Sequence, residues 1–149
     1  MKYYLFVLAS LFSLPSLSYE LEGFGIDLGL WSGHRSYVKE EIGDDCFNET
    51  HNLIGVTYNG YSFGRYKNTV CEESFYLGKE YGLHKSKYGE LKAGLALATG
   101  YVKYNHERIL AFPHLSYTVP VSTYLSTRFM YIPKSLVGVS FHVPLNLEF

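Results

Sequence analysis

The chain has 149 residues and a formal net charge of −1, with 13 lysines and arginines against 14 aspartates and glutamates. This near-neutral balance argues against a nucleic-acid partner, because such a partner is bound by a strongly basic surface. Aromatic residues make up 17% of the chain and include 15 tyrosines, which fits either a packed core or the two aromatic girdles of a membrane barrel.

The first residues predict export. Met1 and Lys2 are followed by an apolar run, Tyr3–Leu14, and then by Ser16-Leu17-Ser18, which has the small-x-small pattern of a cleavage site. The apolar run is too short to cross a membrane as a helix. We therefore expect a signal peptide over residues 1–18 and one mature domain over residues 19–149.

The mature chain divides into eight segments with the period-2 pattern of strands, and no stretch of useful length has helical periodicity. The strongest local signal is Asn59-Gly60, which predicts a tight hairpin between the second and third segments. The expected strands are Phe24–His34, Thr50–Tyr58, Tyr61–Thr69, Glu73–Tyr81, Tyr88–Tyr101, Ile109–Thr118, Ser122–Tyr131 and Val139–Phe149.

The last segment decides between two fold classes. Every second residue from Val139 to Phe149 is apolar, and the residues between them are mostly polar. A soluble β-sandwich could also hide one apolar face, but an eleven-residue alternation in an exported chain favours a strand that faces lipid. The sequence predicts an all-β protein, an eight-stranded antiparallel transmembrane β-barrel in the bacterial outer membrane.

The cysteines provide a consistency check on this topology. If both ends of the barrel chain are periplasmic, the links at Asn59-Gly60, Gly82–Lys87 and Pro120 lie inside the cell. The remaining links lie outside: Val38–Glu49, Val70–Glu72, Lys103–Arg108 and Pro133–Leu136. Cys46 and Cys71 then lie on adjacent outer loops of an exported protein, so a disulfide between them is expected.

The same topology gathers polar groups at the outer rim. His34 ends the first strand, and Asn68 with Thr69 ends the third. An imidazole, a hydroxyl and an amide at one rim could provide the base, the nucleophile or donor, and the oxyanion partner of an acyl transfer. The alternative is that these are rim groups that meet water and lipopolysaccharide headgroups.

Four short motifs then resemble one known family. In chain order they are Gly33-His34-Arg35, Phe47-Asn48-Glu49, Lys67-Asn68-Thr69 and Met130-Tyr131-Ile132-Pro133. Together with the terminal aromatic strand, they look like the ordered landmarks of the outer-membrane lipid A palmitoyltransferase (PagP-like) family. The resemblance spans almost the whole mature chain, although each motif is short.

The resemblance implies an eight-stranded barrel that moves a palmitoyl chain from a glycerophospholipid to lipid A. The essential histidine of the family matches His34, and its Asp-Ser pair matches Asn68-Thr69. That pair is a departure, because an amide cannot act as a carboxylate that orients a histidine, and threonine is a more hindered hydroxyl. The family's N-terminal amphipathic helix is also missing, because only Tyr19–Gly23 precedes the first strand.

Two prolines and three small residues are candidate substrate-binding residues. Pro113 and Pro133 resemble the family's prolines at a lateral opening, and a proline cannot donate to a β-ladder, so a lipid tail could enter there; they could equally mark strand ends. Gly94, Ala96 and Ala98 share a predicted lumenal face, where small side chains leave room for a hydrocarbon chain. The alternative is that tyrosines from neighbouring strands fill that space.

Arg65 and Lys67 share one face near the outer rim, where they could pair with lipid A phosphates. Basic residues on a lumenal face more often form internal ion pairs. The other histidines do not have zinc-ligand spacing, so no metal and no cofactor are expected.

Strict alternation places His34 on the same face as Leu28 and Leu30, which we expect to face lipid because Asp27 needs the lumen. Either a bulge at Gly33 turns the histidine inward, or His34 lies above the bilayer.

Three functions remain open from the sequence. The first is a lipid A acyltransferase whose partners are membrane lipids, a glycerophospholipid donor and lipid A as acceptor. The second is a non-catalytic small barrel with a role in adhesion or membrane integrity. The third is a hydrolase that removes an acyl chain from lipid A.

Overall fold

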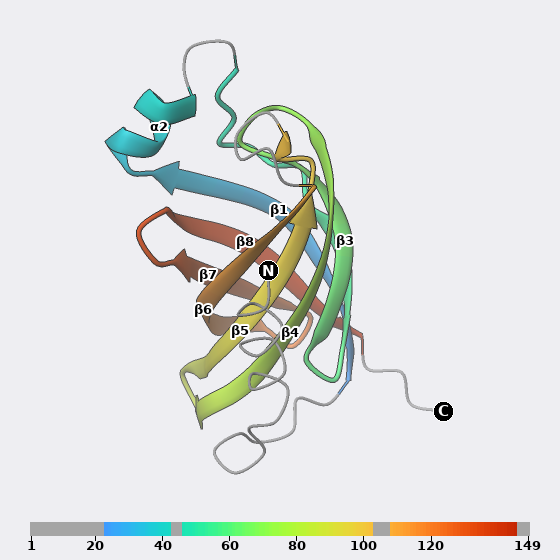
Figure 1. The fold of residues 1–149 in the computed structure, drawn as a ribbon. Helices are drawn as coiled ribbons and strands as arrows, with labels where there is room; N and C mark the ends of the chain where they lie inside the picture. Colours follow the sequence, from blue (N-terminus) through green and yellow to red (C-terminus); the bar gives the residue numbers. More distant parts are fainter. Residues whose placement is uncertain (1–22, 43–45, 103–107, 146–149) are drawn as a thin grey trace, which may run out of the picture.

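A computed structural model of the chain describes residues 23–42, 46–102 and 108–145. Within these residues, eight antiparallel strands close into a barrel in which each strand pairs with its neighbours in sequence and β8 pairs with β1 (Figure 1). The strands are β1 (Phe24–His34), β2 (Ile54–Tyr58), β3 (Tyr61–Lys67), β4 (Glu73–Ser86), β5 (Gly89–Thr99), β6 (Ile109–Ser122), β7 (Leu125–Ile132) and β8 (Leu136–Leu145). The predicted all-β barrel fold is confirmed.

Several strand ends differ from the prediction: β2 begins at Ile54 and not at Thr50, β8 already begins at Leu136, and β4 and β6 are longer because bulges carry their ladders further. β4 continues past Gly82 to Ser86, with one extra residue accommodated between Gly82 and His84 against β5. β6 continues past Pro120, with a second irregularity before Ser122. A bulge inserts a residue without ending the pairing, so glycine and proline at these positions mark bulges and not the expected turns.

The polar stretch after β1 contains one short helix that the sequence did not indicate. It is α2, Ser36–Ile42. The predicted signal peptide, the middle of the link before β6 (residues 103–107) and the last four residues of the terminal strand lie outside the described residues. No helix in the described part of the chain is long and apolar enough to cross a membrane.

The barrel has two different ends. The turns Asn59-Gly60, Lys87-Tyr88 and Thr123-Tyr124 lie at one end, together with the start of β1 and the end of β8. We call this the hairpin end. α2 and the links that join β3 to β4 and β7 to β8 lie at the other, the loop end (Figure 1). A disulfide joins Cys46 to Cys71 there, with 6.0 Å between the Cα atoms, and confirms the predicted pairing.

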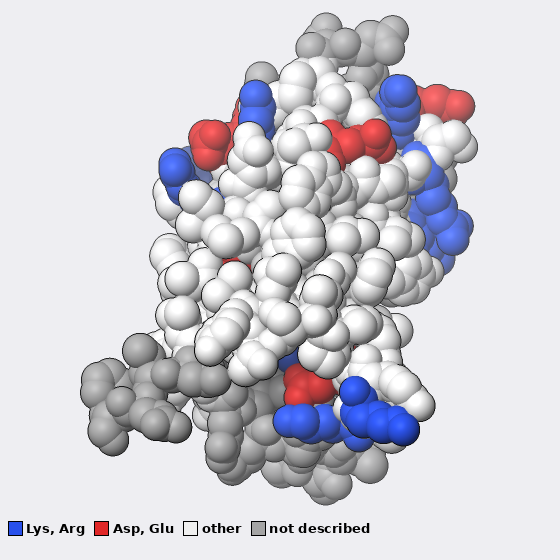
Figure 2. Space-filling view, turned by 180° about the vertical axis from the view of Figure 1, so that it is seen from behind, with Lys and Arg blue, Asp and Glu red and all other residues white. Residues whose placement is uncertain are grey.

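The outer wall of the barrel is apolar. Along the strands, exposed large side chains alternate with buried ones, as in β3, where Tyr61 and Phe63 are exposed and Gly64 is buried. Figure 2 shows an uncharged band across the middle of one face, with lysine, arginine and carboxylate side chains gathered at the two ends. A closed eight-stranded barrel with such a wall is the architecture of a membrane barrel.

The lumen is polar at its centre. Asp27 and Glu80 are both bonded to Arg128, at 2.9 Å and 3.3 Å respectively. His142 Nδ1 lies 2.7 Å from Asp27, and His114 Nε2 lies 3.1 Å from Glu80. We call these five residues the charged layer. They separate a small cavity at the loop end from a larger one at the hairpin end, and Glu80 and Arg128 line both.

Candidate functional site

A bulge in β1 decides which way His34 points. In the pairing of β1 with β8, Leu28 is opposite Phe141 and Leu30 is opposite Ser140, so Gly29 is an extra residue. Its φ of +58° lies in the left-handed region that glycine adopts most readily. The bulge is therefore at Gly29 and not at Gly33.

The bulge reverses the faces of the rest of the strand. Leu30 is buried and lines the loop-end cavity, whereas Trp31 is 45% exposed on the outer wall. Strict alternation predicted that Leu30 faces lipid, and this assignment is wrong. The same shift brings Ser32 and His34 to the lumenal side, where the His34 side chain is 2% exposed.

His34 and Thr69 are in direct contact at this rim. Thr69 Oγ1 lies 3.0 Å from His34 Nε2, and the threonine is 5% exposed. The segment after Cys46 holds the backbone of the threonine in place, because Asn48 N–H donates a hydrogen bond to the Thr69 carbonyl at 2.9 Å. The structure thus brings together a hydroxyl and an imidazole that are 35 residues apart in sequence.

A chain of hydrogen bonds continues from the other side of the imidazole. Ser32 Oγ lies 3.3 Å from His34 Nδ1 and 2.6 Å from His51 Nε2. His51 Nδ1 lies 2.7 Å from the backbone carbonyl oxygen of Lys67. His51 is 2% exposed, so water does not compete for these bonds.

The direction of every bond in this chain follows from its far end. The Lys67 carbonyl only accepts, so His51 Nδ1 carries the proton and His51 Nε2 accepts from the Ser32 hydroxyl. The serine oxygen then accepts from His34 Nδ1–H, which leaves His34 Nε2 without a proton. Thr69 therefore donates its hydroxyl hydrogen to His34. This is the arrangement of a base beside a nucleophile.

These hydrogen-bond directions hold when both imidazole rings are neutral, and the burial of the rings favours the neutral form. Burial lowers the pKa of the His51 imidazole below its ordinary value, with smaller opposing effects from the Lys67 carbonyl and from Glu49. The His34 side chain is equally enclosed, and burial disfavours a charged imidazole.

The carboxylate nearest to His34 is Glu49. Its Oε1 lies 3.7 Å from His34 Nδ1 and accepts a bond from the His34 backbone N–H at 3.4 Å. Half of the glutamate side chain is exposed. This carboxylate is well placed to stabilise the ring electrostatically when His34 takes up a proton.

Asn68 lies apart from this group. Its side-chain NH₂ donates to Ser74 Oγ at 3.0 Å and to the Gly100 carbonyl at 2.6 Å. Its oxygen accepts from the Glu72 backbone N–H at 2.8 Å. Asn68 is fully buried, and the partners of its side chain in the described part of the chain are Ser74, Gly100 and Glu72, so it stabilises the link between β3 and β4.

An apolar cavity of about 110 Å³ lies directly below Thr69 and His51. Ala96 and Ala98 line it, and Gly94 lies lower in the lumen beside Glu80 and His114. Tyrosines also enter this space, as Tyr66 and Tyr101 join their hydroxyls at 2.9 Å. The remaining apolar lining is Leu30, Leu53, Phe112, Met130, Ile132 and Leu136.

The ladder between β6 and β7 is incomplete near this cavity, which leaves an opening in the hydrogen-bonded wall. Their pairing begins at Leu115 opposite Tyr131 and runs toward the hairpin end. Pro113 and Pro133 come two residues beyond that pair, so residues 109–114 of β6 have no β7 partner. The missing donor of a proline explains why the ladder stops there.

Arg65 and Lys67 are exposed on the outer face of β3 and belong to the same row as Phe63. They are not lumenal ion-pair partners. Among the described residues, no group of three or more His, Cys, Asp or Glu side chains is arranged to hold a metal ion.

No protein-family model, curated protein or solved structure matches this chain. The resemblance to the lipid A palmitoyltransferases therefore depends on the four short motifs and the terminal aromatic strand alone.

Three residues of the site were not predicted from the sequence. Ser32 stands two positions before His34, and this spacing could have placed both on one face of the strand. Glu49 was noted only as part of a motif. His51 carried no signal, because its contact with Ser32 depends on how the irregular segment before β2 packs against β1.

Proposed function

We propose that this protein is an outer-membrane enzyme that moves a palmitoyl chain from a glycerophospholipid to lipid A. The observation that carries the proposal is the hydrogen bond between Thr69 and His34 at the edge of an apolar cavity. A hydroxyl that donates to a neutral imidazole is the activated nucleophile of acyl-transfer chemistry.

In the proposed first step, Thr69 Oγ attacks the ester carbonyl carbon of the phospholipid while its proton passes to His34 Nε2. The tetrahedral intermediate collapses, the ester C–O bond breaks, and the leaving lysophospholipid oxygen takes the proton from His34. Glu49 stabilises the imidazolium during this exchange.

In the second step, a lipid A hydroxyl gives its proton to His34 and attacks the carbonyl carbon of the acyl-threonine. The bond to Thr69 breaks, and the threonine oxygen recovers its proton from His34. Thr69 and His34 return to their starting states. Ser32 and His51 keep the same tautomer of His34 available throughout.

The opening between β6 and β7 supports a lateral route for the acyl chain, since it lies beside Phe112 and Met130 of the cavity lining. The cavity of about 110 Å³ is smaller than a usual ligand pocket, which is roughly 300–1,000 Å³. Binding a long acyl chain therefore requires tyrosines such as Tyr66 and Tyr101 to move aside. Arg65 and Lys67 are outside the barrel near the same end, where they can meet acceptor phosphates.

The test is mass spectrometry of lipid A from bacteria that express the protein. A gain of one palmitoyl group is expected, whereas a loss of an acyl chain would indicate a hydrolase and an unchanged mass a non-catalytic barrel. The variants His34→Ala and Thr69→Val should lower the gain at least about a hundredfold, as for lost acid–base catalysis. The control is His84→Ala, which alters an exposed histidine of β4.

A further inference from the structure

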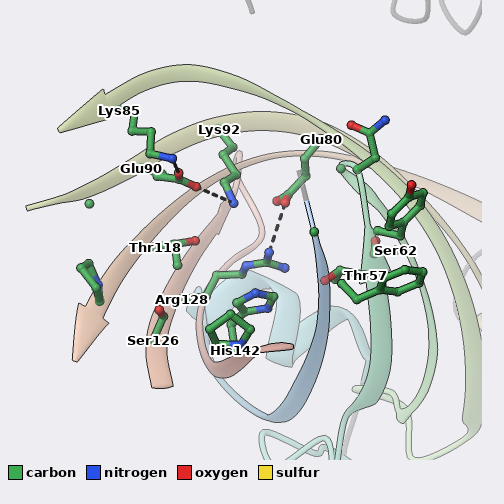
Figure 3. Close-up of a pocket in the computed structure, with 18 of the residues that line it drawn as sticks. Thr57, Ser62, Glu80, Lys85, Glu90, Lys92, Thr118, Ser126, Arg128 and His142 are labelled. Carbon is green, nitrogen blue, oxygen red and sulfur yellow. Dashed lines mark ion pairs between the residues drawn. The ribbon is translucent and has the colours of Figure 1, made fainter. Parts of the chain in front are cut away.

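A second cavity occupies the hairpin end of the lumen, on the far side of the charged layer from Thr69. Its volume is about 450 Å³, within the roughly 300–1,000 Å³ that small-molecule sites usually have. Figure 3 shows Lys92, Glu90, Thr118 and Arg128 around it. The reaction proposed above uses none of these residues.

Two buried groups on its wall have no partner. Among the described residues, Thr118 Oγ1 and Arg128 Nε are the buried side-chain polar atoms that make no hydrogen bond. The two residues are directly opposite each other in the ladder between β6 and β7, so their Cβ atoms are about 5 Å apart. Buried polar groups in folded proteins are nearly always satisfied, so an occupant of the cavity that reaches both atoms would supply the partners that the protein does not.

The character of these groups specifies the ligand. Arg128 Nε–H can only donate, and its two terminal nitrogens are already bonded to Asp27 and Glu80. A group that satisfies Arg128 must therefore accept hydrogen bonds. Thr118 can donate to the same acceptor.

The charge of the wall specifies it further. Among the described residues, Lys85, Lys92 and Arg128 face the cavity with Glu80 and Glu90, and Asp27, which is bonded to Arg128, balances the third positive charge. Glu90 is shared by both lysines, at 3.0 Å and 3.1 Å (Figure 3). Asp27 lies behind Arg128 and lines the other cavity. The unpaired donors of Thr118 and Arg128, with the Lys92 ammonium group on the same wall, favour an anionic acceptor over a neutral one because charge-assisted hydrogen bonds are stronger.

We propose that the hairpin-end cavity binds a small oxyanion, a phosphate or carboxylate group, through Thr118 Oγ1–H, Arg128 Nε–H and the Lys92 ammonium group. The group can belong to a soluble molecule that enters from the hairpin end or to the headgroup of an anionic lipid. The site is independent of acyl transfer at the loop end.

The experiment is isothermal titration calorimetry of the purified full mature protein in a non-ionic detergent, with sodium phosphate or sodium acetate as the titrant and sodium chloride as the reference salt. Saturable binding of at least one oxyanion, and not of chloride, is expected. Thr118→Val should weaken it about tenfold or more, as for a hydrogen bond lost to a charged group. Thr127→Val, on the outer face of β7, is the matched control and should bind as the wild type does.

Thr118→Val should fold as the wild type does, because the Thr118 hydroxyl has no protein hydrogen-bond partner to lose. The unfolding temperature of Thr118→Val should equal or exceed that of the wild type. No saturable binding of either oxyanion would mean that water alone fills the cavity, and the proposal fails. It also fails if Thr118→Val binds as tightly as the control.

A repeat in lipid nanodiscs distinguishes the two sources of the ligand. If a headgroup is the natural occupant, phosphate binding should disappear in phosphatidylglycerol discs and persist in phosphatidylcholine discs. If the ligand is soluble, binding should be the same in both.

Discussion

At the scale of single residues, the candidate site depends on which atom of His34 holds a proton. The backbone carbonyl of Lys67 sets the direction of four successive hydrogen bonds, through His51 and Ser32 to His34 and Thr69. Each group has only one arrangement that satisfies its neighbour. Ser32 is the decisive link, because its single hydrogen must go to His51 and its oxygen must accept from His34.

Ser32→Ala therefore tests the tautomer argument. Without the serine, His34 Nδ1 loses its hydrogen-bonded oxygen, and the ring can turn toward Glu49, whose Oε1 lies 3.7 Å from the same nitrogen. The proposed palmitoyl transfer to lipid A should fall on the order of a hundredfold, as for a catalytic group displaced by about 1 Å, while the barrel stays folded. Rates measured with a radiolabelled phospholipid donor in micelles provide the readout.

Ser126→Ala is the matched control, because Ser126 also faces the lumen but lies in β7 at the hairpin end. It should retain the wild-type rate. A full rate for Ser32→Ala would show that the hydrogen-bond chain does not orient the base.

At the scale of an element, the single extra residue in β1, Gly29, decides which side chains of this strand face the lumen at the loop end. Before Gly29, the strand follows the expected alternation, and after it every side chain exchanges faces. A one-residue shift in a strand always moves its side chains to the opposite side of the sheet. The same strand thus offers Asp27 to the charged layer and Ser32 with His34 to the loop end.

Two glycine substitutions in β1 should have opposite outcomes. Gly29→Ala places a Cβ at a φ of +58° and 2.8 Å from the Trp31 ring, so it strains the bulge. Gly33→Ala has an ordinary φ and open space around the new methyl group. We expect Gly29→Ala to lose about 1–2 kcal/mol of unfolding free energy and Gly33→Ala to lose almost none.

Urea unfolding in detergent micelles, followed by the fluorescence of Trp31, measures the unfolding free energy of both variants. Equal stability of the two variants would argue against a bulge at Gly29.

At the scale of the whole molecule, the barrel combines an apolar outer wall with a polar core. Closure leaves no unpaired sheet edge, and the lumen is just wide enough for side chains to meet across it. Arg128 of β7 forms ion pairs with Asp27 of β1 and Glu80 of β4, so the charged layer links three strands across the lumen. It also keeps the two cavities apart, which allows different chemistry at the two ends.

Arg128→Met tests the contribution of this layer. It leaves two buried carboxylates without their cation, so about 3–5 kcal/mol of stability should be lost. Lys85→Met is the comparison, because the Lys85 side chain is 66% exposed and its bond to Glu90 is partly solvated. That variant should change stability by less than about 1 kcal/mol. Guanidinium unfolding in micelles provides both values, and a similar loss for the two would contradict the structural importance of the layer.

The sequence by itself determined the strands, the barrel and the disulfide between Cys46 and Cys71. Alternation and the Asn59-Gly60 turn are local features, and the link topology followed from counting strands. Only the tertiary structure decided the face of His34 and the presence of Glu49 and His51 beside it. The physical reason is that a single bulge residue reverses all the side chains after it, and no local pattern says which of two glycines carries the bulge. The irregular segment before β2 is positioned by contacts with β1 and with the link after β3, so its histidine and glutamate reach the site only when the barrel has closed.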